Sequence, residues 1–357
     1  MSGYNYVLPL ADLSDASQYA LNNEIEWSRD TSHPWGIHLE DPEPWNILLG
    51  PVKPRGGVAG VVNLSGERVE SFGDIDRADQ TFSVAKTYLA LIAGVAYDDG
   101  LIVDIDEKIS NKLPGIGFDS PHNQDITWRQ LLQQTSEWRG ECVGIPDQVD
   151  HYRILSFQDR PAERQPKGTL RSLNYPGSYW EYNDVRINQL SLALLHLFQR
   201  ELPDVFRERI LEPLGASSNW SWDSYDGAEV ETSSGRLKTV PGGSHWGGGV
   251  SISARDQVLI GELIKNEGAV NGRSVISSEW VRRMRAPCPI ANFYGLLTWL
   301  NTERRLFKSL PETSVFAIGA GGAYTWIDSV LDLVVVVRWI SPNAAETYFS
   351  KILNCLN

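Results

Sequence analysis

The sequence predicts an α/β protein of the α+β type, in which a mainly antiparallel sheet flanked by helices carries an inserted all-helical lobe. Strand signals gather near both ends of the chain, whereas the middle reads as helices separated by long polar loops. This order predicts a single sheet that is formed by segments from both ends of the chain. We divide the chain into an N-terminal wrapping segment (1–56), a sheet domain (57–97 plus 246–357) and a helical lobe (98–245), with a single unit over about 57–340.

The individual elements follow from local patterns. Two short strand-like runs, at 58–64 and 68–72, flank a Ser-Gly turn dipeptide and predict a hairpin. Thr127 and Gln130 have the spacing of a capping box at a helix start. Further helices are expected over 81–97, 188–199, 204–214 and 254–266 and after a cap formed by Asn343 and Glu346, and further strands over 250–253, 324–327 and 333–340.

Charge and composition argue against several kinds of partner. The 357 residues include 32 Lys and Arg against 45 Asp and Glu, and this formal charge of −13 disfavours nucleic acid and anionic membranes. Residues 1–12 lack a basic cluster followed by an apolar run. Cys142, Cys288 and Cys355 are widely spaced and fit reduced thiols. We therefore expect a cytoplasmic protein without metal or cofactor that acts on a small molecule.

The most informative motif is Ser83-Val84-Ala85-Lys86, at the start of the helix expected over 81–97. The ten residues after Thr87 carry no charge, so this helix is expected to be buried on all sides. Burial lowers the pKa of a lysine amine, which can then act as a base for a serine three residues earlier on the same face. The helix amino terminus also favours a developing oxyanion. The motif thus predicts a serine nucleophile beside its base.

A structural interpretation of the same motif is also available. Ser83 would cap the helix, and Lys86 would extend its amine to solvent. The spacing alone is weak support for catalysis, because it arises by chance in a chain of this composition. The apolar run behind Lys86 favours the catalytic interpretation.

These segments resemble the serine β-lactamase-related hydrolases, a family that includes class C β-lactamases, D,D-peptidases, carboxylesterases and nylon-oligomer hydrolases. The resemblance extends from about Gly57 to Val337 and implies a β-lactamase/transpeptidase-like fold. Gln134 stands where the family usually has a histidine. Besides Ser83-x-x-Lys86, the resemblance rests on residues 131–136, 247–256 and 332–337.

The family's second motif is Tyr-x-Asn, whose tyrosine shares proton transfer with the lysine. Tyr182-Asn183-Asp184 matches it, with Asp184 at the amide position. A carboxylate near Lys86 favours the charged amine and opposes its use as a free base. Two solutions stay open: Asn183 supplies the amide, or Tyr182 is the principal base beside a charged Lys86. In the structural alternative, Tyr182 only packs beside Trp180.

The third motif is Lys-Thr-Gly in β-lactamases and peptidases, where its cation receives the substrate carboxylate. The matching stretch, 318–323, keeps glycines but has no cation, as the resemblance leads us to expect of esterase-type members. The resemblance implies an oxyanion hole made by the backbone N–H groups of Ser83 and Gly322, next to Gly321. The other predicted substrate-binding residues are Asn183, Asp184 and Trp246.

Together the motifs predict a serine hydrolase that cleaves esters or amides through an acyl-enzyme on Ser83, with Lys86 and Tyr182 moving the proton. β-Lactamase or D,D-peptidase activity is an alternative that needs a cation, which Arg338 or His245 could supply from elsewhere in the chain. An acyltransferase and a non-catalytic binding protein on the same fold are the remaining alternatives.

Overall fold

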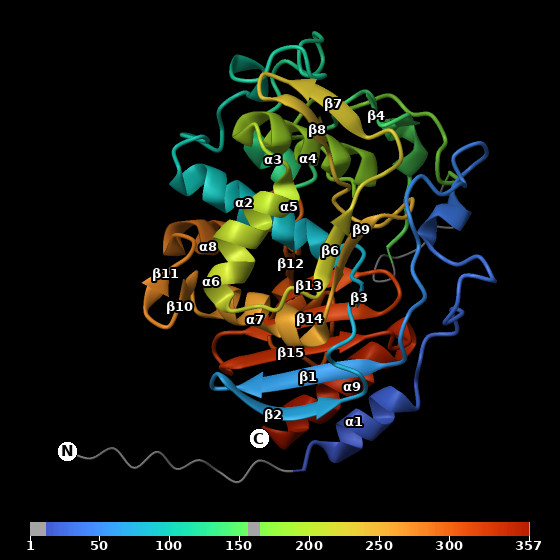
Figure 1. The fold of residues 1–357 in the computed structure, drawn as a ribbon, viewed down its shortest axis with the longest axis vertical. Coiled ribbons are helices and arrows are strands. Elements are labelled where there is room, and N and C mark those ends of the chain that lie inside the picture. The colour runs from blue at the N-terminus through green and yellow to red at the C-terminus, as the bar shows by residue number, and fades with distance from the viewer. Residues whose placement is uncertain (1–11, 156–164, 357) are drawn as a thin grey trace.

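A six-stranded sheet organises the computed structural model, which describes residues 12–155 and 165–356 (Figure 1). Its order is β12-β13-β14-β15-β1-β2, and each neighbouring pair is antiparallel. Because β1 pairs with β15, the predicted sheet made from both ends of the chain is confirmed. The strands are β1 (Ala59–Leu64), β2 (Glu67–Phe72), β12 (Trp299–Leu300), β13 (Val315–Gly319), β14 (Ala323–Asp328) and β15 (Leu333–Arg338).

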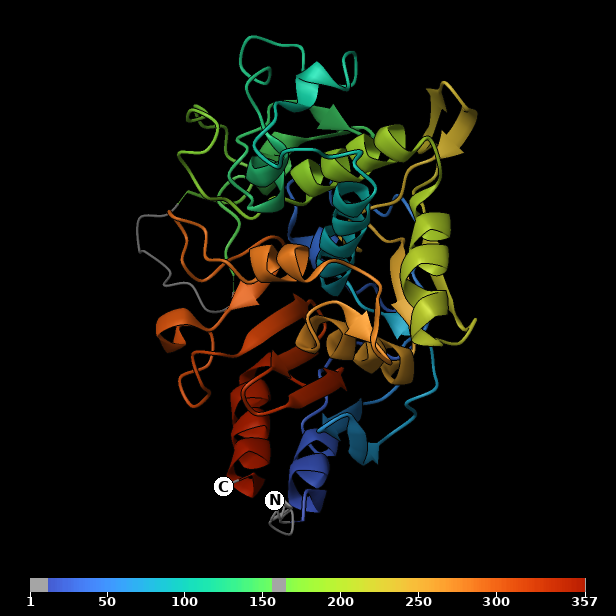
Figure 2. The ribbon, with the colours of Figure 1, turned by 90° about the vertical axis from the view of Figure 1, so that its left-hand side faces the viewer.

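Helices cover both faces of this sheet. Successive strand side chains point to opposite faces, and β14 shows the consequence: Trp326 packs on Phe349 of α9, whereas Thr325 accepts a hydrogen bond from Gln257 of α7. Figure 2 shows α1 beside α9, near the two described ends of the chain. The helices are α1 (Ser14–Leu21), α7 (Ala254–Lys265), α8 (Ser278–Met284) and α9 (Pro342–Cys355).

Helix α2 (Val84–Asp98) lies between the sheet and the lobe, where it contacts β13 and α8 on one side and α4 and α5 on the other. Its buried residues run from Val84 to Ala96, as its apolar sequence predicts. The lobe helices are α3 (Trp128–Leu132), α4 (Asp184–Phe198), α5 (Leu202–Phe206) and α6 (Glu212–Leu214), with a π-turn at Arg207–Leu211 between the last two.

The stretch 98–245 also contains strands that we did not predict. β6 (Trp220–Asp223) pairs with β9 (Gly249–Ile252), which pairs with β3 (Asp79–Gln80), so a three-stranded sheet joins this stretch to the rest of the molecule. These segments are too short to show a periodic pattern. The division into three parts at 56, 97 and 245 stays a prediction. The small hairpins are β4 (Glu141–Cys142) with β5 (Ile145–Pro146), β7 (Glu229–Thr232) with β8 (Gly235–Lys238), and β10 (Ala269–Val270) with β11 (Arg273–Ser274).

The first residues of three helices confirm one predicted cap and correct two other predictions. The capping box of Thr127 and Gln130 is confirmed. The predicted cap at Asn343 is wrong, because Pro342 occupies the first turn of α9 and the helix begins after Ser341. Helix α4 begins at Asp184 rather than at residue 188, because Asn183 Oδ1 accepts the N–H of Arg186 and caps it earlier.

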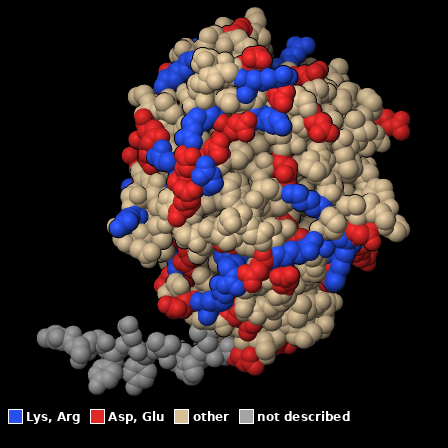
Figure 3. All heavy atoms as spheres, viewed as in Figure 1, with Lys and Arg blue, Asp and Glu red and all other residues tan. Residues whose placement is uncertain are grey.

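Acidic and basic side chains are mixed on the face that Figure 3 shows. Ion pairs such as Arg209 with Asp99 at 2.5 Å join opposite charges at the surface. No helix in the described ranges is both long and apolar enough to cross a membrane. Residues 1–11, on which the predicted lack of an export signal depends, lie outside the described residues.

Candidate active site

Ser83 and Lys86 meet at the amino-terminal end of α2. Lys86 Nζ donates a hydrogen bond of 2.8 Å to Ser83 Oγ. Ser83 is the N-cap residue of the helix and is 7% exposed, and Lys86 is 1% exposed. The positive end of the helix dipole therefore acts on a hydroxyl group that already contacts an amine. The structure brings the predicted pair together, and its catalytic role stays a prediction.

The residue before the nucleophile has an unusual backbone. Phe82 has φ +50°, in the left-handed region that bulky side chains rarely adopt. Three indole rings hold its side chain, with centroid distances of 5.6 Å to Trp27, 6.1 Å to Trp35 and 6.3 Å to Trp339. Trp27 and Trp35 belong to the segment before residue 57, whose function the sequence does not reveal. That segment thus fixes the backbone immediately behind Ser83.

Asp184 is the carboxylate partner of Lys86. One of its oxygens contacts Lys86 Nζ, and the other accepts hydrogen bonds from Arg153 at 2.6 Å and from His245 Nδ1 at 2.7 Å. Burial alone raises the pKa of Asp184, but the charges of Arg153 and Lys86 and the hydrogen bond from His245 outweigh burial and hold the pKa well below its usual range. An ionised Asp184 stabilises the ammonium form of Lys86.

The contacts continue from His245 into the N-terminal segment. His245 Nε2 lies 3.0 Å from Asp41 Oδ2. Both ring nitrogens therefore face carboxylates, and both can donate at once only in the imidazolium form. Sequence analysis considered His245 as an alternative source of the third-motif cation, as a residue at the edge of the cleft or as a structural histidine. Asp41 gave no signal because it lies in a stretch without periodicity. We call the set formed by Lys86, Asp184, Arg153, His245, Asp41, Asp150 and Lys167 the lysine network.

Three members of this network have the donor atoms of a metal site. One ligand atom each of Asp41, Asp150 and His245 lies within 4.8 Å of the other two. Lys167 Nζ contacts Asp41 and lies 3.1 Å from Asp150 Oδ1 and 3.3 Å from His245 Nε2. Burial raises the pKa of Asp150, but Lys167, His245 and Arg153 outweigh burial and lower the pKa to about 2. The ammonium group thus already supplies the positive charge that these carboxylates need.

The aromatic ring of Tyr182 lies beside Lys86. Lys86 Nζ is 4.8 Å and the Arg153 guanidinium 5.1 Å from the ring centroid, which are cation–π distances. The ring also has aromatic neighbours: it stacks on Trp299 at a centroid distance of 5.2 Å and lies 6.3 Å from Tyr294 and 6.4 Å from Trp180. Among the described residues, the Tyr182 hydroxyl group forms no hydrogen bond with Ser83 or Lys86. Two cations therefore face the ring, and proton transfer by its hydroxyl group stays a prediction.

Two predicted substrate-binding residues have other contacts. Asn183 caps α4 and donates its amide N–H to the carbonyl oxygen of Asp147 at 2.8 Å. Asp184 rather than Asn183 thus contacts the lysine. Trp246 is fully buried, and its indole N–H donates to the carbonyl oxygen of Trp45 at 3.1 Å. Substrate contacts by Asn183 and Trp246 stay predictions.

The glycines of the predicted third motif, Gly319, Gly321 and Gly322, differ in how they lie relative to the nucleophile, and the oxyanion role of Gly322 stays a prediction. A Cβ at Gly319, the last residue of β13, would lie 3.2 Å from Ser83 N. Gly322 packs against the backbone of Ile340, and Gly321 packs against the rings of Trp339 and Trp27. The structure therefore brings the backbone at Gly319 to Ser83, which favours this position over Gly322 for an oxyanion donor.

Gly243 is a neighbour of the pair that sequence analysis missed. A Cβ there would lie 2.8 Å from Lys86 Nζ and 3.4 Å from Ser83 Oγ. Its backbone thus approaches the nucleophile as closely as a residue without a side chain permits. The pair of glycines shortly before His245 is the available signal in the sequence.

The class of protein follows from this arrangement. A buried serine contacts a lysine one helical turn away, between an antiparallel sheet and a largely helical lobe, as in serine hydrolases that form acyl-enzymes. The Beta-lactamase family matches residues 78–343, and the chain belongs to this family.

Solved structures share the fold across most of the chain. A putative beta-lactamase from Bacteroides dorei DSM 17855 has a TM-score of 0.60 at 20% identity, covering 86% of this chain and 94% of its own. EstCE1, a hydrolase with promiscuous acyltransferase activity, has a TM-score of 0.61 at 14% identity, covering 96% and 97%. A putative 6-aminohexanoate-dimer hydrolase from Bacillus anthracis has a TM-score of 0.58 at 15% identity, covering 99% and 97%.

Proposed function

We propose that this serine hydrolase cleaves carboxylic esters or amides through a covalent acyl intermediate on Ser83. The observation that supports the proposal most directly is the 2.8 Å hydrogen bond between Lys86 Nζ and Ser83 Oγ at the amino end of α2. An amine in contact with a serine hydroxyl group at a helix amino terminus is an arrangement for nucleophilic attack.

In the proposed reaction, Ser83 Oγ bonds to the substrate carbonyl carbon while its proton passes to Tyr182. We assign this base because Asp184 keeps Lys86 charged, and because Lys86 and Arg153 place two positive charges against the tyrosine ring. The oxyanion accepts hydrogen bonds from the N–H of Ser83 and from the backbone next to Gly319.

Collapse of this intermediate breaks the bond to the leaving group. The alcohol or amine departs with the proton from Tyr182, and Ser83 is left as an ester. Water then gives a proton back to Tyr182 and adds to the acyl carbon. Release of the carboxylic acid product restores the serine hydroxyl group.

We expect substrates without a carboxylate near the scissile bond, because Arg338 and His245 are both engaged by other buried groups. Arg338 is 2% exposed, and it donates to Gln257 Oε1 and to the carbonyl oxygen of Asp79, each at 3.1 Å. His245 lies between two carboxylates of the lysine network. Both candidates for the missing third-motif cation thus have buried partners. Cleavage of short-chain p-nitrophenyl esters without cleavage of a chromogenic cephalosporin is the expected result.

Covalent labelling tests the acyl-enzyme. After treatment with a fluorophosphonate, intact-protein mass spectrometry should show one adduct on the wild type and none on Ser83→Ala. Ser191→Ala is a matched control, because Ser191 Oγ in α4 is buried without a hydrogen-bond partner among the described residues. Equal labelling of wild type and Ser83→Ala would refute the assignment. Absence of both labelling and turnover in the wild type would instead favour a binding protein.

A further inference from the structure

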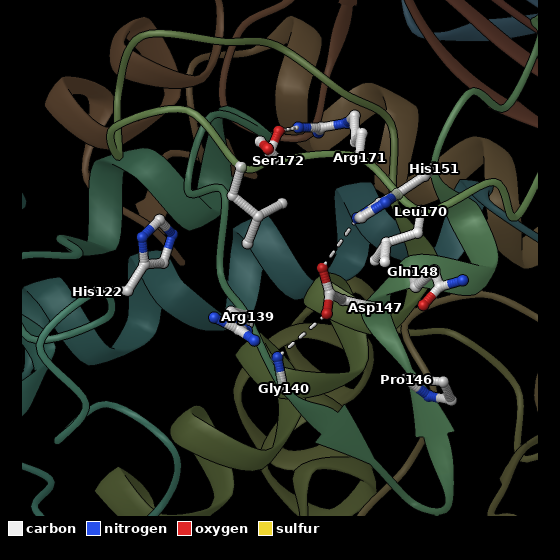
Figure 4. Close-up of a pocket in the computed structure, with 11 residues that line it drawn as sticks. His122, Arg139, Gly140, Pro146, Asp147, Gln148, His151, Leu170, Arg171 and Ser172 are labelled. Carbon is white, nitrogen blue, oxygen red and sulfur yellow. Dashed lines mark hydrogen bonds and ion pairs between the residues drawn. The ribbon is translucent and has the colours of Figure 1, made fainter. Parts of the chain in front are cut away.

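A cavity of about 730 Å³ lies in the lobe, apart from the serine–lysine pair (Figure 4). Its volume is within the usual range of small-molecule sites. None of Ser83, Lys86 and Tyr182 is among its described lining residues. The charged and titratable lining residues used below are Arg139, Asp147, His151 and Arg171.

His151 offers this cavity a buried nitrogen without a partner. The side chain is 2% exposed, and its Nε2 lies 3.1 Å from Asp147 Oδ2. Burial raises the pKa of Asp147, but the hydrogen bond from His151 and the charge of Arg186 outweigh burial and lower the pKa. Because an ionised Asp147 only accepts hydrogen bonds, Nε2 carries the proton. His151 Nδ1 is buried without a hydrogen-bond partner among the described residues, and a ligand could satisfy it.

Among the described residues that line the cavity, the side-chain charge that has no ion-pair partner is positive. The exposed Arg139 guanidinium forms no ion pair within residues 12–155 and 165–356. Arg171 is neutralised by Glu137 at 2.5 Å and Glu181 at 2.6 Å. Asp147 is the acidic lining residue, and its oxygens already accept bonds from Gly140, His151 and Arg186. The cavity therefore favours an anion although the chain carries a formal charge of −13.

Apolar side chains complete the lining. Pro146, Leu170 and Leu173 line the same cavity, and Leu170 is 73% exposed, so its apolar surface is available to a ligand. Figure 4 shows Leu170 and the Asp147–His151 pair on the same side of the cavity. A hydrocarbon group could cover Leu170 while its charged end meets the basic residues.

We propose that this cavity binds a small organic carboxylate with an apolar body. The carboxylate would pair with Arg139, and the hydrocarbon would contact Leu170 and Leu173. In the imidazolium form that a bound anion favours, His151 would also donate a hydrogen bond to the carboxylate from Nδ1. A planar guanidinium suits a carboxylate because it donates two parallel hydrogen bonds. The proposal does not depend on catalysis by Ser83.

Isothermal titration with octanoate tests the proposal, with octanamide as the uncharged probe of equal length. The wild type should bind one octanoate, and octanamide should bind at least tenfold more weakly. Arg139→Gln should weaken octanoate binding about tenfold. The matched control is Arg273→Gln, which removes an exposed arginine outside the cavity and should leave the affinity unchanged.

A second variant tests the apolar part of the site. Leu170→Gln changes an exposed side chain, so folding should be preserved, and octanoate binding should weaken severalfold. Absence of saturable octanoate binding to the wild type, equal affinity for octanamide, or equal effects of Arg139→Gln and Arg273→Gln would each overturn the proposal.

Discussion

Two buried charge networks flank the segment from Tyr182 to Asp184. They differ in their cations, because the first contains Lys86 and Lys167 beside an arginine and a histidine, whereas the second contains arginines and a histidine but no lysine. The lysine network contacts Ser83 through Lys86. The second network is centred on Arg171 and Arg186, whose guanidinium groups share Glu137 at 2.5 Å and 2.9 Å. We call the set formed by Arg171, Arg186, Glu137, Glu181, Asp147 and His151 the arginine network.

This difference in cations suits one network to a structural role and the other to a role in catalysis. A guanidinium is a planar fork that satisfies two carboxylates at once and keeps its proton, which suits a fixed structural role. An ammonium is a point charge that can contact a carboxylate and a serine at the same time. One network thus fixes the lobe, whereas the other connects the fold to the nucleophile. Helix α4 carries members of both, since Asp184 and Arg186 lie in its first turn.

Removing the lysine should have the largest effect on activity. Lys86→Ala should lower kcat/KM for a p-nitrophenyl ester by about 10³-fold or more, because the nucleophile loses its adjacent cation. Lys86→Arg should not restore activity, because a guanidinium cannot replace a point charge in this contact. Steady-state kinetics provide the measurement. A loss below tenfold for Lys86→Ala would remove the distinction between the networks.

Breaking the arginine network should have the largest effect on stability. Arg186→Met removes one buried cation from Glu137 and from Asp147, which keep only Arg171 and His151, and we expect a loss of about 3–5 kcal/mol in the free energy of unfolding. Arg207→Met is the control, because this side chain pairs only at the surface and its loss should have a much smaller effect on stability. Denaturant titration followed by circular dichroism measures both. Equal losses would contradict the proposed structural role.

Neutralising Asp184 should change the pH dependence of catalysis. Asp184→Asn removes a negative charge beside Lys86 and Tyr182, so the catalytic base should lose its proton more easily and the acidic limb of the kcat/KM profile should move to lower pH. Glu181→Gln, in the arginine network, should leave the position of that limb unchanged. Coincident profiles for Asp184→Asn and the wild type would show that Asp184 does not act on the base.

The arginine network should also make stability depend on pH. Burial raises the pKa of Glu137, but Arg171 and Arg186 outweigh it and lower the pKa to about 2, whereas an unfolded glutamate titrates near about 4.3. The unfolded state therefore takes up protons first as pH falls, and the stabilisation present above about pH 4.3 is lost towards about pH 2. Tm should fall between pH 5 and pH 3. Glu137→Gln should flatten this dependence, and an unchanged slope would exclude Glu137 as its source.

The smallest expected effect concerns Asn183. Asn183→Ala removes the cap of α4 and should cost about 1 kcal/mol of stability, while kcat/KM should change less than threefold. Thermal unfolding and ester kinetics on the same samples distinguish the two outcomes. A large loss of activity at unchanged stability would instead support the substrate contact predicted from the sequence.

Local spacing explains what the sequence could predict. Ser83 and Lys86 lie one turn apart on a helix that is apolar enough to be recognised, so their contact follows from the helix itself. The carboxylate of Asp184 was foreseeable because it directly follows Tyr182 and Asn183. The β1–β2 hairpin was equally local.

Contacts between distant residues explain what the sequence could not predict. Asp41 and His245 meet only in the folded chain, and neither lies in a periodic element that would indicate its direction. The glycines from 319 to 322 are so close together in sequence that only the path of the turn decides which one meets Ser83. The capping role of Asn183 was not foreseen, because the helix was expected to begin at residue 188.

The pairing of β1 with β15 has a consequence for the order of synthesis. Ala59 is aligned with Arg338, and Ser83 lies against Gly319, so these early segments find their partners only after more than 200 further residues have been synthesised. Such non-local contacts slow folding and leave strand edges exposed in the meantime. A nascent chain that has not yet exposed β13 to β15 would carry the serine and the lysine without the sheet that surrounds them. Activity should therefore appear only after β13 to β15 have emerged from the ribosome.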